Sequence, residues 1–306
     1  MTDQTKYSTD IGVLNAAIQK KFNAEMDQVG LCGCYDRYFY KPTTSVRWSD
    51  FARLAACHGA IAIQIPGEDR LVLDIPFITP SSTQPDECEF IEEMEVAELK
   101  GVLPVGFGYD CDTLAIYDMA QLGNILVSCD KYTFLENLFV ASSVLNKSKL
   151  MFIGTDDSNY ITAYDLCENR VGDITDNVAD TVRAIYDLDG YIKYRAEHKD
   201  DTNIVVLIDN IAQIIQADKN IVNVLRSILQ HAADAGVYIV CFDRDYGKKI
   251  SPELRASFTT KIVFKMPTSA ISKKALGESG AQLLGPDDML MIVGGLPLVH
   301  LMMPSM

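Results

Sequence analysis

Apolar residues near the N-terminus recur about every 3.6 positions, which is typical of an amphipathic helix. Over residues 8–30 these positions are Ile11, Leu14, Ala17, Ile18, Phe22 and Met26. A second helix is predicted over 48–58, and apolar runs predict strands around 32–40, at 60–65 and at 70–75. Pro66 and Gly67 indicate a turn between the last two strands. We therefore expect a smaller α/β domain over residues 1–98.

From about residue 101 the pattern changes to short apolar strands separated by helices. Strands are predicted at 124–127, 149–153, 204–208, 237–242, 261–264 and 289–293, and helices at 133–145, 178–194, 220–235 and 252–257. Strands that are apolar throughout and alternate with helices indicate a parallel sheet covered on both faces. The sequence therefore predicts an α/β domain over residues 99–306.

A polar, acidic stretch separates the two patterns. Residues 80–90 are rich in turn formers, and seven carboxylates lie between Asp86 and Glu98. Such a run is typical of a solvated helix or a linker, so we expect the domain boundary there. Over the whole chain, 42 acidic residues against 27 Lys and Arg give a net charge of −15. This balance argues against a protein that coats nucleic acid through bulk electrostatics.

The cysteines and the N-terminus bear on compartment and metal binding. The first residues contain no apolar segment of a signal peptide, and no run reaches the ~18 apolar residues that cross a bilayer, so we expect a cytoplasmic protein. The eight cysteines form no CxxC pair. We expect free buried thiols and no metal, with a site at Cys32, Cys34, Cys57 and His58 as the weaker alternative.

The second half contains a series of motifs. A buried strand at 204–208 ends in Asp209 and Asn210, and a helix ending at Gly236 leads into a strand that ends in Asp243 and Arg244. A third motif follows at Gly280, Ala281, Leu283, Leu284, Gly285, Asp288, Met289 and Leu290. Together these motifs resemble the motor domain of the FtsK/SpoIIIE family of DNA translocases, in which the third motif reads G-A-x-x-L-L-G-x-G-D-M-L.

The first half resembles the same family. Residues 65–67 and 73–76 are similar to the I-P-G and I-E-[IL]-P stretch of the small domain that precedes the motor. Residues 103–127 resemble the strands leading to the nucleotide loop. The EssC/EccC ATPases of type VII secretion belong to the same superfamily and remain an alternative. The resemblance implies a RecA-like parallel sheet at 99–306 in a bacterial, ring-forming protein of the P-loop NTPase superfamily.

Family motors hydrolyse ATP at a P-loop, G-x-x-x-x-G-K-[ST], whose amides, Lys and Ser/Thr hold the phosphates and Mg²⁺. Here the strand at 124–127 is followed by a loop without glycine, made of Ser128, Cys129, Asp130, Lys131, Tyr132 and Thr133. Lys131 and Thr133 have the wrong spacing, and Asp130 would repel phosphate. The alternative without a nucleotide role is that Lys131 is a solvated loop residue and Tyr132 packs at a helix start. We expect a degenerate nucleotide loop.

The other catalytic positions are also altered. Asp209 stands where the family's strand-end Asp orders Mg²⁺, but Asn210 replaces the following Glu, and an amide is no general base. Asp243 replaces a sensor Gln, whereas Arg244 is kept. Three changes together predict lost hydrolysis, so Asp209, Asn210, Asp243 and Arg244 are expected to be relics, with no cofactor unless the divergent loop still binds ATP and Mg²⁺. Alternatively, Asp209 simply caps a turn and Arg244 forms a salt bridge.

A weak nucleic-acid site is predicted at Arg255, Lys261, Lys273 and Lys274, with a solvated surface as the equal alternative. Three functions follow. The first is a pseudo-ATPase that acts as a binding or assembly subunit, on a protein partner or on itself. The second is an ATP-dependent DNA translocase with a divergent loop. The third is a different activity grafted on the fold.

Overall fold

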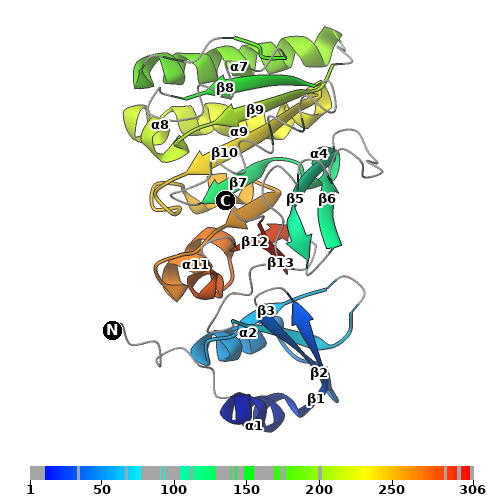
Figure 1. Cartoon of the computed structure of the whole chain (residues 1–306). Coiled ribbons are helices and arrows are strands. Elements are labelled where there is room, and N and C mark those ends of the chain that lie inside the picture. The colour runs from blue at the N-terminus through cyan, green and yellow to red at the C-terminus, as the bar shows by residue number, and fades with distance from the viewer. Residues whose placement is uncertain are drawn as a thin grey trace, which may run out of the picture. The chain divides into compact units, whose positions relative to one another are not determined.

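The structure is a computed structural model. It describes residues 11–32, 35–65, 68–76, 90, 93, 104–110, 113–128, 139, 142, 148–154, 169–172, 175, 177–198, 202–285, 288–294 and 298–303. By their contacts the residues fall into two compact units (Figure 1). Unit 1 comprises Met1–Asp86, Gly108–Ala115 and Val263–Met306, and unit 2 comprises Glu87–Phe107 and Ile116–Ile262. The expected boundary near residue 98 lies outside the described residues and stays a prediction.

The N-terminal part of unit 1 is a small antiparallel sheet with two helices. Its elements are α1 (Ile11–Phe22), β1 (Ala24–Cys32), β2 (Tyr35–Pro42), α2 (Trp48–Cys57), β3 (Ile61–Ile63) and β4 (Leu71–Pro76). The strands lie in the order β1-β2-β4-β3, and neighbouring strands are antiparallel. Buried residues of both helices, such as Leu14, Ile18 and Phe51, form one core with residues of the sheet. The predicted smaller α/β fold is therefore confirmed, as an antiparallel sheet that packs against two helices.

The first predicted helix is too long. Residues 24–30 belong to strand β1, and α1 ends at Phe22, where Asn23 adopts a left-handed conformation (φ 47°). The periodicity had included Met26, but this side chain is 47% exposed. Local periodicity extended the helix, whereas pairing with β2 decides for a strand.

The C-terminal part of unit 1 contains α11 (Ser269–Leu276), η3 (Ala281–Leu283), β12 (Asp288–Val293) and β13 (Leu298–Met302). Thr268 caps α11 by accepting a hydrogen bond from the Ile271 amide, and Gly277 ends it with φ 98°. Strands β12 and β13 are antiparallel, and Met302 of β13 pairs with Tyr109. Tyr109 belongs to β5 (Pro104–Asp110), which is followed by β6 (Thr113–Asp118) and α4 (Met119–Leu122).

Unit 2 contains strands in the order β11-β7-β10-β9-β8, and Figure 1 labels β7, β10, β9 and β8. The strands are β7 (Ile125–Ser128), β8 (Lys149–Ile153), β9 (Ile204–Ile208), β10 (Val237–Asp243) and β11 (Thr260–Val263). The helices are α7 (Val178–His198), α8 (Ile211–Ala217), α9 (Ile221–His231) and α10 (Pro252–Ala256), with the 3-10 turn η2 (Ala233–Ala235). The pairs β7/β10, β10/β9 and β9/β8 are parallel. This confirms the predicted parallel α/β sheet.

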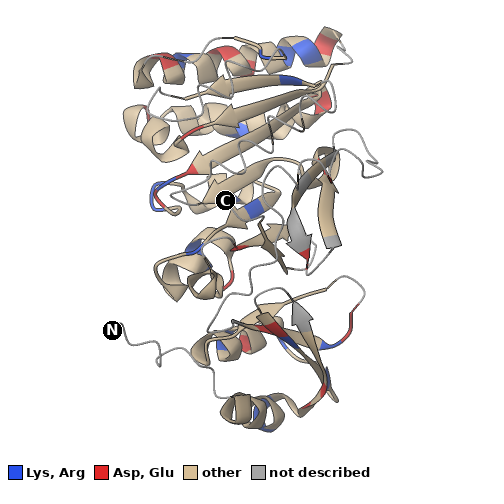
Figure 2. Cartoon of the chain, viewed as in Figure 1, with Lys and Arg blue, Asp and Glu red and all other residues tan. Residues whose placement is uncertain are grey.

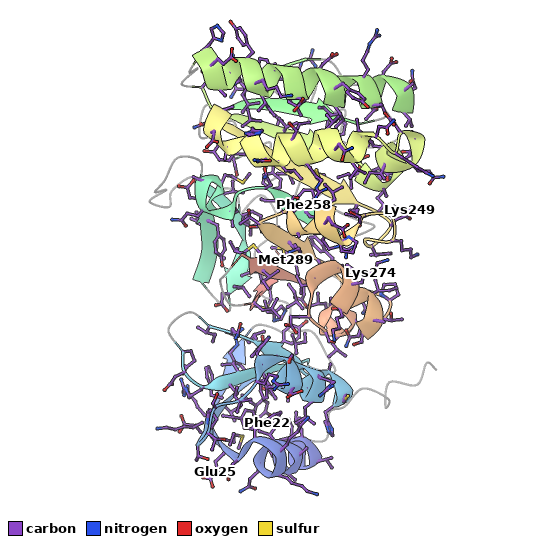
Figure 3. The ribbon with its side chains drawn as sticks, turned by 180° about the vertical axis from the view of Figure 1, so that it is seen from behind. Phe22, Glu25, Lys249, Phe258, Lys274 and Met289 are labelled. Atoms are coloured by element: carbon purple, nitrogen blue, oxygen red, sulfur yellow. The ribbon has the colours of Figure 1, made fainter. Side chains whose placement is uncertain are left out.

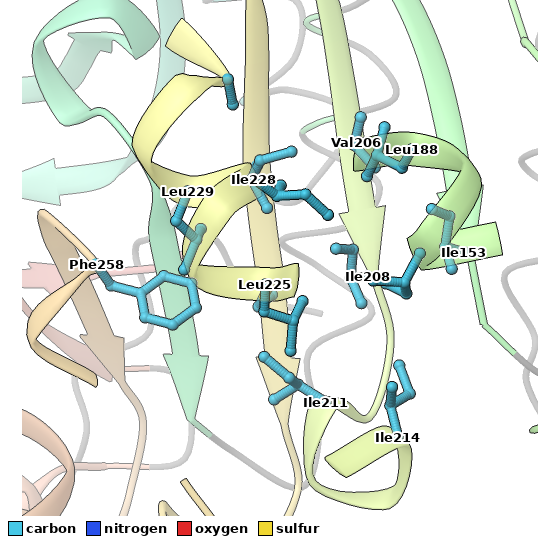
Figure 4. Packing of buried hydrophobic residues seen from close by; sticks show 14 of the residues in the cluster. Ile153, Leu188, Val206, Ile208, Ile211, Ile214, Leu225, Ile228, Leu229 and Phe258 are labelled. Carbon is cyan, nitrogen blue, oxygen red and sulfur yellow. The ribbon is translucent and has the colours of Figure 1, made fainter. Parts of the chain in front are cut away.

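The core of unit 2 lies between this sheet and helices α7, α8 and α9. Val206 and Ile208 of β9 meet Leu188 of α7 and Leu225 of α9 in one buried cluster (Figure 4). All five residues of β9 are buried, which is why its sequence is apolar without alternation. None of the described helices combines the length and apolarity needed to cross a membrane.

Candidate functional site

The strongest candidate site is the edge of unit 2 where the parallel strands end. Asp243 pairs with Ser128 across β10 and β7, and Ile208 pairs with both Cys241 and Ile153. Strand β10 thus lies between β7, which ends at Ser128, and β9, which leads into Asp209. Open α/β sheets bind their ligands outside the carboxyl ends of such strands.

Asp209 is held by Arg244 at this edge. The carboxylate is 4% exposed, and Nη2 of Arg244 donates a hydrogen bond to its Oδ2 over 3.0 Å. Its main-chain amide donates to the carbonyl of Ile153 over 2.9 Å. Gly154 leaves room for the aspartate, because a Cβ at this position would lie 2.8 Å from the Cβ of Asp209. One oxygen of this carboxylate is therefore engaged by a guanidinium.

Asn210 has a local structural role. Its backbone is left-handed (φ 47°, ψ 52°) and precedes helix α8. Its side-chain amide donates to Oε1 of Gln213 over 3.1 Å. Asparagine tolerates this backbone region better than most residues with a Cβ. Asn210 thus fits the turn, and its side chain is an amide that bonds to Gln213.

Asp243 organises the turn after β10. This fully buried carboxylate accepts hydrogen bonds from the amides of Asp245 (3.0 Å) and Gly247, and lies 3.5 Å from Oγ of Ser128. Burial raises the pKa of Asp243 above its ordinary value, although the two amides oppose the shift. Tyr246 and Gly247 both have positive φ (52° and 74°). Asp243 therefore caps the tight turn that follows β10.

The predicted nucleotide loop is described only at its first residue. Ser128 is buried at the end of β7, whereas Cys129, Asp130, Lys131, Tyr132 and Thr133 lie outside the described residues. The degenerate loop therefore stays a prediction. For the alternative metal site, Cys57 and His58 are described but Cys34 is not. No metal-binding cluster of His, Cys, Asp or Glu occurs in the part of the chain that the structure describes.

The four basic residues have different surroundings. Arg255 in α10 donates to the carbonyls of Gly247 (2.7 Å) and Ile250 (3.1 Å), and burial lowers its pKa. Lys261 is partly buried, and its pKa is lowered by burial and by Arg255. Lys273 and Lys274 are exposed in the last turn of α11, where Figure 3 labels Lys274. Arg255 thus braces the turn behind Asp243, and DNA contact by these residues stays a prediction.

The motif at 280–290 holds a loop closed inside unit 1. Oδ2 of Asp288 accepts hydrogen bonds from the Gly285 amide (2.9 Å) and from the hydroxyl of Tyr35. A Cβ at Gly285 would lie 2.6 Å from that oxygen, so a larger residue would displace the carboxylate of Asp288. Burial, reinforced by Asp288, raises the pKa of Tyr35. Asp288 thus joins this motif to Tyr35 of strand β2.

A buried ionic cluster beside this loop was missed by the sequence reasoning. Arg37 of β2 donates two hydrogen bonds to Asp74 of β4 (2.8 and 3.0 Å) and one to Asp110 (2.9 Å). Nδ1 of His300 lies 2.8 Å from Oδ2 of Asp74. Burial alone would raise the pKa of Asp74, but the bonds from His300 and Arg37 outweigh it and lower this pKa. An Asp in a predicted apolar strand was the available signal.

Comparison with known proteins places these features in context. No family model matches the chain. The DNA translocases FtsK of Brucella melitensis and Rhizobium meliloti are each 37% identical over 95 residues, which is 30% of this chain and 12% and 11% of those proteins. The match thus spans about an eighth of the length of these relatives or less.

Solved structures resemble the chain in fold. The conjugation coupling protein TcpA of pCW3, in its monomer form with ATPγS, superposes with a TM-score of 0.59 at 11% identity, covering 95% of this chain and 94% of TcpA. The cytoplasmic domain of the type VII secretion ATPase EccC of Thermomonospora curvata gives 0.59 at 12% identity, over 73% of this chain and 32% of EccC. The resemblance inferred from the motifs is confirmed: the chain is similar in sequence to FtsK translocases over part of its length and has the RecA-like fold of FtsK/SpoIIIE-like ATPases.

Proposed function

We propose that this protein is a catalytically degenerate FtsK/SpoIIIE-like domain that acts as a binding or assembly subunit. The ion pair between Asp209 and Arg244 carries the proposal, because it occupies the carboxylate on which Mg²⁺ chemistry would depend. Asn210 supports it, since its amide accepts no proton from an attacking water. Asp243, tied to the turn amides, completes a set of three altered positions.

The rest of the proposal concerns organisation and surroundings. Residues 1–98 form the small domain and residues 99–306 form the motor-like domain. The partner is a protein, either an active motor or assembly subunit or a further copy of this chain. The location is the bacterial cytoplasm. Support comes from the fold of the neighbours, which include a conjugation coupling protein and secretion ATPases.

Nucleotide binding and hydrolysis test the proposal directly. Isothermal titration of the whole chain with ATP and Mg²⁺ is expected to show no micromolar binding, and turnover with or without DNA is expected to equal that of Asp209→Ala. Restoring the family residue with Asn210→Glu is expected to leave turnover at the same background. Micromolar binding together with turnover that Asp209→Ala abolishes would overturn the proposal.

The alternative is an ATP-dependent DNA translocase with a divergent loop. It is favoured by Asp209 and Arg244 being placed at the carboxyl edge of the sheet, and by a fold shared with TcpA, which was solved with ATPγS. In that case DNA stimulates turnover, and reversing charge at Lys273 and Lys274 reduces the stimulation. The matched control is reversal at Lys20 and Lys21, a pair of lysines in the last turn of α1.

A further inference from the structure

Helix α7 presents an exposed aromatic stripe with a glycine at its centre. Tyr186 is 42% exposed and Tyr194 is 57% exposed, four residues before and four residues after Gly190. A Cβ at Gly190 would meet no atom within 4 Å. The inner face of the helix is buried through Ile185, Leu188 and Ile192. Large exposed rings on both sides of a bare backbone position favour close approach by another helix.

Charged residues of this stripe lie at equal distances in sequence before and after Gly190, and the two members of each such pair have opposite charges. Arg183 lies seven residues before it and Glu197 seven residues after it, and both are exposed. At about 100° per residue, both fall within about 20° of the direction of Gly190. Asp187 and Lys193 lie three residues before and after it, toward opposite borders of the stripe. Figure 2 shows positive and negative segments alternating along α7.

We propose that α7 docks antiparallel onto α7 of a second copy of this chain, with Gly190 at the crossing point. In that arrangement Arg183 faces Glu197 of the second copy at both ends of the contact. Tyr194 of the second copy lies beside Asp187, and Tyr186 of the second copy lies beside Lys193. The hydroxyl of Tyr194 can then donate a hydrogen bond to the carboxylate of Asp187, and the ammonium of Lys193 can lie over the ring of Tyr186.

Charge complementarity argues for a second copy over an unrelated partner. The stripe matches itself only when the helix is reversed, and a surface that complements its own two-fold image is the hallmark of an isologous dimer. Parallel docking would instead oppose Arg183 to Arg183 and Glu197 to Glu197. One helix pair buries less than the roughly 1,200 Å² of stable complexes, so the dimer is weak and needs high concentration.

The α7 dimer names the partner in the proposed assembly role, and it depends on the proposed function only for that role. Self-association is measured without nucleotide. A failed test of the dimer can therefore be told apart from a failed test of the lost ATP hydrolysis. Sedimentation velocity of the whole chain over a concentration series is expected to show a reversible dimer that weakens with salt. Arg183→Glu is expected to lower the association constant about tenfold or more, because each dimer then contains two like-charge pairs.

Two further variants make the test specific. The double variant Arg183→Glu with Glu197→Arg exchanges both charges and is expected to restore association to about the wild-type level. Gly190→Cys is expected to form an oxidised dimer across the axis, whereas Ala196→Cys, exposed on the same helix but about 120° away, is not. A monomer at every concentration, no rescue by the exchange, or equal cross-linking at both positions would overturn the proposal.

Discussion

Nη2 of Arg244 lies 3.0 Å from Oδ2 of Asp209 and joins the residues that follow two neighbouring parallel strands. The aspartate is 4% exposed and the arginine side chain 35% exposed. A carboxylate so deeply buried is stable as an anion only with a partner of opposite charge. The pair therefore explains how an acidic residue persists at the end of the apolar strand β9.

Removing the arginine is expected to destabilise the protein. Breaking a fully buried pair costs about 3–5 kcal/mol, and because Arg244 is partly screened by solvent we expect Arg244→Ala to lower the free energy of unfolding by about 1–2 kcal/mol. Urea denaturation measures the change. The double variant Asp209→Asn with Arg244→Ala should lose less than the sum of the single variants. Additive losses would show that the two side chains do not interact.

The cluster around Asp74 predicts acid sensitivity. Its folded-state pKa lies below the unfolded value of about 3.9, so its stabilisation is present above that pH and is lost as pH falls through the folded pKa. Asp74→Asn is expected to cost about 3 kcal/mol at neutral pH, because it removes the buried one of the two carboxylates that pair with Arg37 and leaves only Asp110. The acid dependence of unfolding should also flatten. Arg53→Ala, which breaks an exposed pair with Asp50, is the control and should change little.

The hydroxyl of Tyr35 is expected to stabilise the closed loop of the 280–290 motif. Tyr35→Phe removes its bond to the buried carboxylate of Asp288 and is expected to cost about 1–3 kcal/mol. Tyr194→Phe, on the exposed face of α7, should cost less than about 0.5 kcal/mol. Thermal unfolding of the two variants compares them directly. Equal effects would mean that Tyr35 acts only through its ring.

Two glycines are expected to respond to alanine with opposite signs. Gly190 lies inside α7 with open space around it, so Gly190→Ala should raise the free energy of unfolding by about 0.5–1 kcal/mol. Gly236 follows η2 with φ 67°, where a Cβ is strained, so Gly236→Ala should lower it by about 1 kcal/mol. Denaturant titration at low protein concentration, where the chain is monomeric, separates these effects from self-association.

Local pattern was sufficient for much of the fold. The continuous apolar run at 204–208 predicted strand β9 because a strand buried on both faces needs no alternation. Ser251 and Pro252 are residues that favour a helix start, and they begin α10. Gly236 ends the helical segment of α9 and η2, as predicted. Asp209 and Arg244 were identified by motif, and the salt bridge was foreseen as one alternative for Arg244.

Other features depended on residues far apart in sequence. Strand β1 was predicted as helix because its pairing partner β2 is not visible in a local period. The hydrogen bonds of Asp74 with Arg37 and His300 join residues 37 and 226 positions apart, and no spacing rule reaches that far. The sequence by itself determined the parallel strands and the helices of unit 2, and it predicted, without a test, that the catalytic positions of the family are altered. Only the tertiary structure decided which charges neutralise one another, because burial and pairing are properties of the packed chain.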